Sequence, residues 1–150
     1  MLRLLALCLC MFTLSAFSVD VTGTWKLNTK KSKYTGMPMP KEMTVTYTPE
    51  GSGWRYAAKG TSATGQRMES GFTYVKDGEE IKTTGFPNWD SIVVNNATSD
   101  KASGIMKRGG KEVGTLTRII SEDGKTMTIR GKATTPDGKP VSYVSVYERE

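Results

Sequence analysis

Turn signals recur along the chain at short, even intervals, and they constrain the fold more than any other feature of the sequence. They are Glu50-Gly51-Ser52-Gly53, Asp77-Gly78, Gly109-Gly110, Asp123-Gly124 and Asp137-Gly138. Asp-Gly and Gly-Gly pairs supply the positive φ angles that tight hairpin turns require. No long window carries the apolar repeat of a helix. The spacing therefore predicts an all-β chain of short antiparallel strands.

Ten runs between these turns have the composition of strands, and the longer ones alternate apolar and polar side chains. The runs are 24–28, 42–48, 54–59, 66–75, 80–84, 91–95, 102–108, 111–120, 126–133 and 141–148. A meander of this length leaves two unpaired edges unless it closes. We therefore expect a single antiparallel up-and-down β-barrel of about ten strands. A two-sheet sandwich is the alternative, but it needs longer crossing connections than most of those here.

The first eighteen residues have the pattern of a signal peptide. Arg3 gives a positive start, and residues 4–14 form an uncharged apolar run that is too short to cross a bilayer. Ala16 and Ser18 place small side chains where a signal peptidase reads, so we expect cleavage after Ser18. The expected organisation is a signal peptide, 1–18, and one secreted or periplasmic barrel domain, 19–150, without a transmembrane segment.

Cysteine and histidine usage limits the chemistry of the chain. The sequence has no histidine, and its two cysteines, Cys8 and Cys10, lie in the expected signal peptide. Lipidation of either cysteine is an alternative, but each follows a leucine where lipoproteins have a small residue. Histidine is the commonest general base and metal ligand. We therefore predict no catalytic residues, no metal and no cofactor; a haem held by tyrosine is the enzymatic alternative.

The chain is basic, with a formal net charge of +6. Its positive residues are scattered, apart from the group Lys30, Lys31 and Lys33, and no arginine-rich run is present. This distribution is typical of a solvated basic surface, so we predict no nucleic-acid partner and a monomer. The alternative is an envelope interaction module with a filled barrel, whose basic surface meets anionic polymers or a partner protein.

The run Gly23-Thr24-Trp25-Lys26-Leu27 resembles the opening strand of intracellular fatty-acid-binding proteins, and its Gly-x-Trp core resembles that of lipocalins. Both families are calycins. Arg118, followed by Asp123-Gly124-Lys125, resembles the strand and turn that carry an interior arginine in the first family. Val146-Tyr147-Glu148-Arg149 resembles its last strand, whose tyrosine faces the ligand carboxylate. The resemblance implies a lipocalin-like barrel that holds a small hydrophobic or amphipathic ligand.

From residue 19 onward, the chain also resembles a set of exported bacterial proteins that begin GTWKLN…KSK and have DGK turns. Two positions depart from the fatty-acid-binding pattern. Ser145 stands where that family has a second clamp arginine, and the connection 29–41, with Pro38 and Pro40, is too short for a helical pair. A fatty acid held by paired arginines is therefore not predicted.

Arg118 is the main candidate for a ligand contact. If Leu116 and Ile120 point inward, Arg118 does too, and a buried guanidinium needs an anion or hydrogen-bond acceptors. The alternatives are an internal acceptor, stacking over Trp25, or exposure to solvent after a one-residue slip in register. On the last strand, Tyr143, Ser145 and Tyr147 share a face that suits an amphipathic ligand if it is interior. The predicted ligand-binding residues are Arg118, Tyr143, Ser145, Tyr147, Tyr56 and Phe72.

Overall fold

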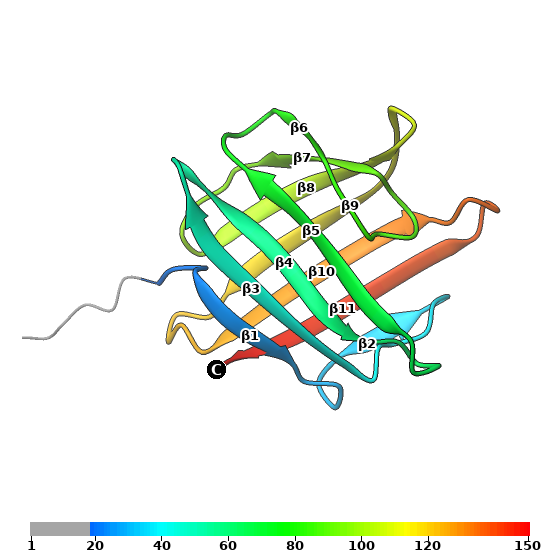
Figure 1. The fold of residues 1–150 in the computed structure, drawn as a ribbon, viewed down its shortest axis with the longest axis horizontal. Helices are drawn as coiled ribbons and strands as arrows, with labels where there is room; N and C mark the ends of the chain where they lie inside the picture. The colour runs from blue at the N-terminus through cyan, green and yellow to red at the C-terminus, as the bar shows by residue number, and fades with distance from the viewer. Residues whose placement is uncertain (1–18) are drawn as a thin grey trace, which may run out of the picture.

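Residues 19–150 are the part of the chain that the computed structural model describes, and they form one antiparallel sheet curled into a nearly closed barrel (Figure 1). Its strands are β1 Gly23–Leu27, β2 Lys33–Thr35, β3 Glu42–Glu50, β4 Gly53–Thr61, β5 Arg67–Tyr74, β6 Glu80–Lys82, β7 Ser91–Asn95, β8 Lys101–Arg108, β9 Lys111–Ile120, β10 Thr126–Thr134 and β11 Pro140–Arg149. The predicted all-β antiparallel barrel is confirmed. The expected signal peptide lies outside the described residues. Within residues 19–150, no helix is long and apolar enough to cross a membrane.

The strand order around the barrel is β5-β4-β3-β1-β11-β10-β9-β8-β7-β6. The sheet curls so that β3, β4 and β5 cross in front of β8 to β11 (Figure 1). The two outer strands meet through a bridge between Gly71 and Thr84, whose two backbone hydrogen bonds are each 3.0 Å long. Gly85 follows with a φ of +76°, and a Cβ there would overlap the carbonyl oxygen of Glu69. Glycine at this position lets the chain cross β5 closely enough to close the barrel.

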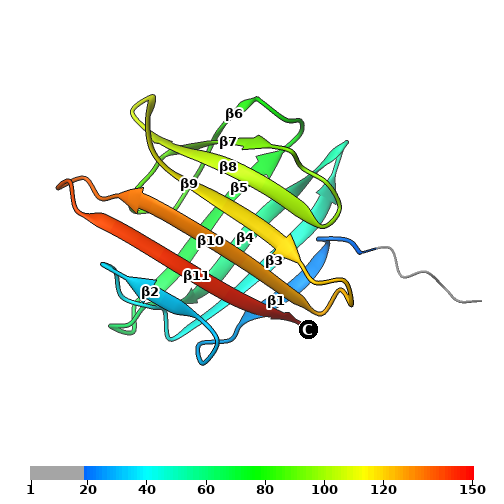
Figure 2. The ribbon, with the colours of Figure 1, turned by 180° about the vertical axis from the view of Figure 1, so that it is seen from behind.

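The connection after β1 contains a strand that the sequence does not predict. Its three residues pair with Ser142–Val144 of β11, beside the part of β11 that pairs with β1. In Figure 2, β2 lies along β11 at the end away from the C-terminus. Three residues are too few to show a period-2 pattern, which is why β2 was not expected. The predicted absence of a helical pair agrees with this arrangement of the described residues.

The buried side chains form two clusters along the barrel. One surrounds Trp25, which is fully buried, and the other surrounds Trp89 in the connection between β6 and β7. In that connection, Phe86 stacks on Trp89 with ring centroids 3.8 Å apart and faces Tyr56 at 6.1 Å. The loop 85–90 therefore packs its aromatic side chains onto the barrel interior, where they also line a cavity.

Candidate ligand-binding cavity

A cavity of about 190 Å³ lies inside the barrel, between the two clusters. Its lining includes all the residues that the sequence nominated for ligand binding. These are Arg118, Tyr143, Ser145, Tyr147, Tyr56 and Phe72. Arg118 lies on β9, Tyr143, Ser145 and Tyr147 on β11, Tyr56 on β4 and Phe72 on β5. On each strand, one residue that points inward places the next but one inward as well. Their role in binding stays a prediction.

Arg118 is the charged residue of this cavity, and only 2% of its surface is exposed. Its Nη2 donates to the carbonyl oxygens of Thr98 and Lys101, both at 3.4 Å. Within residues 19–150, its Nε and Nη1 have no hydrogen-bond partner, and no carboxylate forms an ion pair with it. The guanidinium therefore keeps two buried donors that are free to meet an anion.

Two aromatic rings from the opposite wall hold the Arg118 guanidinium. Its central carbon lies 5.3 Å from the ring centroid of Tyr47 and 5.4 Å from that of Trp54. Tyr47 and Trp54 also contact each other edge to face, with centroids 5.0 Å apart. These cation–π contacts offset part of the desolvation of the guanidinium. The guanidinium also acts on the Tyr47 hydroxyl and opposes the rise of its pKa, but the described residues give neither Nε nor Nη1 a hydrogen bond of good geometry.

Trp25, one of the alternative partners considered for Arg118, is occupied by a different arginine. The guanidinium carbon of Arg149 lies 4.1 Å from the Trp25 ring centroid. Arg149 also donates to the carbonyl oxygens of Gly124 and Thr22, at 2.8 and 2.6 Å. It ties the C-terminal strand, the β9–β10 turn and the N-terminal segment together at one end of the barrel. Arg118 is therefore not needed to cover Trp25.

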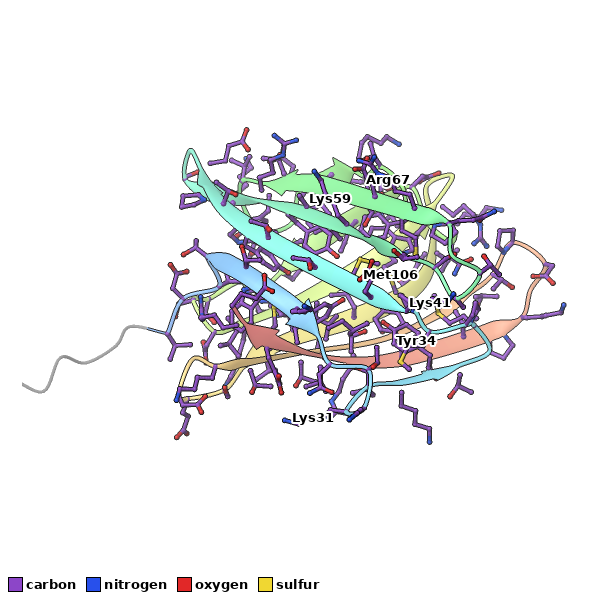
Figure 3. All side chains as sticks on the ribbon, turned by 60° about the horizontal axis from the view of Figure 1, so that its bottom comes forward. Lys31, Tyr34, Lys41, Lys59, Arg67 and Met106 are labelled. Atoms are coloured by element: carbon purple, nitrogen blue, oxygen red, sulfur yellow. The ribbon has the colours of Figure 1, made fainter. Side chains whose placement is uncertain are left out.

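A cluster of hydroxyl groups lies at the same level of the wall as Arg118. Ser145 and Arg118 flank Ile129 in one cross-strand row of β11, β10 and β9. The Ser145 Oγ and the Tyr34 Oη are 2.6 Å apart, and the Tyr34 ring stacks on Tyr143 with centroids 5.8 Å apart. The sequence does not predict Tyr34, because the three residues of β2 are too few to show a period-2 pattern. Figure 3 shows Tyr34 on β2, beside the last strand.

Burial controls the protonation of the tyrosines in the cavity. It raises the pKa of Tyr34, Tyr56, Tyr143 and Tyr147 above the ordinary value for a phenol. Burial also raises the pKa of Tyr47, although the nearby Arg118 acts in the opposite direction. These hydroxyls are therefore neutral at physiological pH and supply no charge to balance Arg118. Among residues 19–150, no group of His, Cys, Asp and Glu side chains could hold a metal ion.

Methionine side chains line the rest of the cavity together with the aromatic residues of the loop 85–90. The methionines are Met37, Met43, Met68 and Met106. Met106 is fully buried, whereas the exposed Lys59 and Arg67 lie on the outside of the same barrel (Figure 3). Thioether side chains are flexible and polarisable, so this part of the wall can adapt to apolar groups of different shapes. The cavity thus combines one cation, several hydroxyls and an adaptable apolar wall.

The structure of the zebrafish ileal bile acid-binding protein in complex with cholic acid is similar to this chain. The TM-score is 0.50 and the identity 12%, over 86% of this chain and 98% of the other. A siderocalin called Ex-FABP, described as having dual ligand specificities, aligns with a TM-score of 0.39 and 13% identity, over 86% of this chain and 73% of that one. The first similarity concerns the fold alone, an antiparallel β-barrel. No protein-family model and no curated protein sequence match the chain.

Proposed function

We propose that this chain is a binding protein whose barrel holds one small amphipathic molecule with an anionic head. The observation that carries this proposal is Arg118, a buried cation with two unpartnered donors on the cavity wall. An isolated buried charge is costly unless a counter-ion or acceptor meets it. A ligand carboxylate would supply both the counter-ion and the hydrogen-bond acceptor. The hydroxyls of Ser145 and Tyr34 lie in the same part of the wall.

The cavity volume limits the size of this ligand. At about 190 Å³, the cavity is smaller than the 300–1,000 Å³ that is usual for drug-sized ligands and slightly larger than an apolar cavity that accepts benzene. A ligand of one or two fused rings fits, whereas a long acyl chain would not be enclosed. Burying about 200 Å² of apolar surface would contribute about 5 kcal/mol before the entropy of association is subtracted. We therefore expect weak affinity, well short of the net of about 8 kcal/mol that micromolar binding requires.

Two further observations support an interior ligand. A barrel of the same fold is known in complex with cholic acid, a small molecule. The alternative function, an interaction module with a filled barrel, would leave no internal space, and an open volume remains here. Neither observation identifies the ligand, which we define only by its chemistry: a compact apolar body and one negative charge.

We also propose that the protein works outside the cytoplasm as a monomer. The charge and hydropathy pattern of residues 1–18 supports export, and the cysteines are confined to this segment. Intact-mass analysis of protein from its source cells should give a chain that begins at Val19, and light scattering should give the mass of one barrel. A full-length intracellular chain would contradict export.

The interior site can be tested with two isosteric probes, 2-naphthoate and the neutral 2-naphthamide, by isothermal titration calorimetry. Because one ionic hydrogen-bonded contact is worth about 1.5–3 kcal/mol, we expect naphthoate to bind at least about tenfold more tightly. Arg118→Met should remove this preference, and Arg55→Met, which removes an exposed arginine from β4, should leave it unchanged. Equal binding of the two probes, or a preference that survives Arg118→Met, would contradict the proposed function.

A further inference from the structure

A second hollow lies on the outer face of the barrel, over β9, β10, β11 and β2, the strands in front in Figure 2. It measures about 460 Å³. The side chains around it stand in two cross-strand rows. One row is Lys33, Val144, Arg130 and Thr117, and the other is Thr35, Ser142, Lys132 and Thr115. The residues of both rows alternate with inward-facing ones, so the hollow and the interior cavity lie on opposite faces of these strands, with Leu116 and Tyr143 bordering both.

The hollow is positively charged. Lys33, Arg130 and Lys132 are exposed, and no acidic residue lines the hollow with them. None of the three forms an ion pair with any residue in 19–150. Nearby Lys31, by contrast, is neutralised by Glu148 at 2.9 Å. The three cations are thus available to a ligand from solution.

The remaining polar lining consists of hydroxyl groups, from Thr35, Thr115, Thr117 and Ser142. Hydroxyls donate to the oxygens of an oxyanion but provide no opposing charge. By the spacing of strands, Lys33 and Arg130 are about 10 Å apart at the backbone, and Arg130 and Lys132 about 7 Å. The three cations thus start from well-separated points of the hollow, and a single small oxyanion would have to draw all three side chains together. A ligand with repeated negative groups would not.

We propose that this hollow binds a linear polyanion with repeating phosphate groups. Nucleic acid fits less well, because the Tyr143 ring of the floor is turned inward onto Tyr34 and no ring face is offered for base stacking. A bilayer of anionic lipid carries phosphate charge as well, and the test below compares it directly. The attraction is electrostatic and exposed to solvent, so it weakens as salt is added. This proposal does not depend on the interior ligand.

The test is fluorescence anisotropy with labelled inorganic polyphosphate, at low and at physiological salt. The variant is the double substitution Arg130→Gln/Lys132→Gln. The matched control, Arg55→Gln/Lys59→Gln, removes one exposed arginine and one exposed lysine from β4. We expect the β10 variant to bind about tenfold more weakly at low salt and with a shallower salt dependence, since fewer counterions are released. The control should change affinity by less than about twofold.

Thermal melts of both double variants establish that they fold, so that lost binding is not lost structure. If both double variants bound polyphosphate equally weakly, the proposal would be overturned, because net charge alone would then explain binding. Absence of polyphosphate binding by the unmodified protein would overturn it as well. So would tighter binding to single-stranded DNA or to vesicles of anionic phospholipid than to polyphosphate, measured in parallel.

Discussion

Arg149 and Arg118 both lie against aromatic rings, but they differ in how many of their nitrogens have hydrogen-bond partners. Arg149 lies 4.1 Å from the Trp25 ring and donates to the carbonyl oxygens of Asp20, Thr22 and Gly124. All three of its nitrogens are used. Arg118 also lies against aromatic rings, but two of its three nitrogens have no partner within residues 19–150.

This difference separates a structural from a binding role. A guanidinium whose donors are all satisfied by the protein holds chain segments together and gains nothing from a ligand. A guanidinium that is buried with free donors destabilises the unliganded fold and becomes stabilising when an anion arrives. The cluster around Trp25 is therefore assigned a structural role, and the proposed function assigns ligand binding to the wall around Arg118.

The largest effect is expected for Trp25→Ala. Trp25 is fully buried at the centre of its hydrophobic cluster, and its Nε1 donates to the carbonyl oxygen of Val21 at 2.9 Å. Removal of a buried tryptophan lowers the free energy of unfolding by about 3–5 kcal/mol. Urea denaturation followed by circular dichroism gives this value. A loss below about 1 kcal/mol would show that this cluster does not stabilise the barrel.

Arg149→Met should come next, with a loss of about 2 kcal/mol, because several charge-assisted hydrogen bonds disappear together. Arg149→Lys keeps the charge but not the planar fork, and it should recover only part of the loss. Binding of naphthoate should be unchanged in both variants that remain folded. Lost binding in folded Arg149→Lys would break the proposed separation of roles.

Arg118→Met should have the opposite sign. Replacing a buried, incompletely paired charge with an apolar side chain of similar length should raise the free energy of unfolding by about 1 kcal/mol. Urea denaturation of Arg118→Met and Arg149→Met measures whether their free energies of unfolding change in opposite directions. A loss as large as that of Arg149→Met would mean that Arg118 is a structural residue.

Tyr34→Phe removes one partner of the hydrogen bond with Ser145 and keeps the ring that stacks on Tyr143. We expect a loss of about 1 kcal/mol in stability, because the Ser145 hydroxyl stays buried. Naphthoate affinity should fall by a few-fold if these hydroxyls meet the ligand head. Ser145→Ala provides the matched variant on the other side of the same bond.

The smallest effect is expected from pH. Burial raises the pKa of Tyr56 and Tyr147 in the folded protein. The folded state then holds protons that the unfolded state releases above its phenol pKa of about 10, so this stability is present below about pH 10 and lost as the pH rises further. Urea midpoints from about pH 8 to about pH 11 should fall less for Tyr56→Phe than for the unmodified protein. If the urea midpoints of both proteins fell equally with pH, the raised pKa of Tyr56 would be excluded as a cause of the loss.

The sequence predicts the barrel and the two faces of each strand because both depend on local periodicity. Alternation within a strand places Arg118 on the face of Leu116 and Ile120, and Tyr143 on the face of Tyr147, but which of the two faces turns inward is decided by the register of the folded sheet. The aromatic partners of Arg118 cannot be predicted from its own strand, because Tyr47 and Trp54 come from the opposite wall. The contact of Arg149 with Trp25 also joins distant parts of the chain, so no local pattern predicts it. The residues that cover Trp25 and the hydroxyl partner Tyr34 thus required the fold itself.

The most direct test is the NMR resonance of the two Nε–H groups, Arg118 and Arg149, in ¹⁵N-labelled protein titrated with 2-naphthoate. Single Arg→Lys variants assign the two signals. The account predicts that the Arg118 Nε–H signal shifts downfield with naphthoate and not with naphthamide, because its free donor gains a charged acceptor. The Arg149 signal should stay in place because its Nε already donates to Gly124. An Arg118 signal that does not move at saturating naphthoate, while calorimetry shows binding, would contradict the central claim.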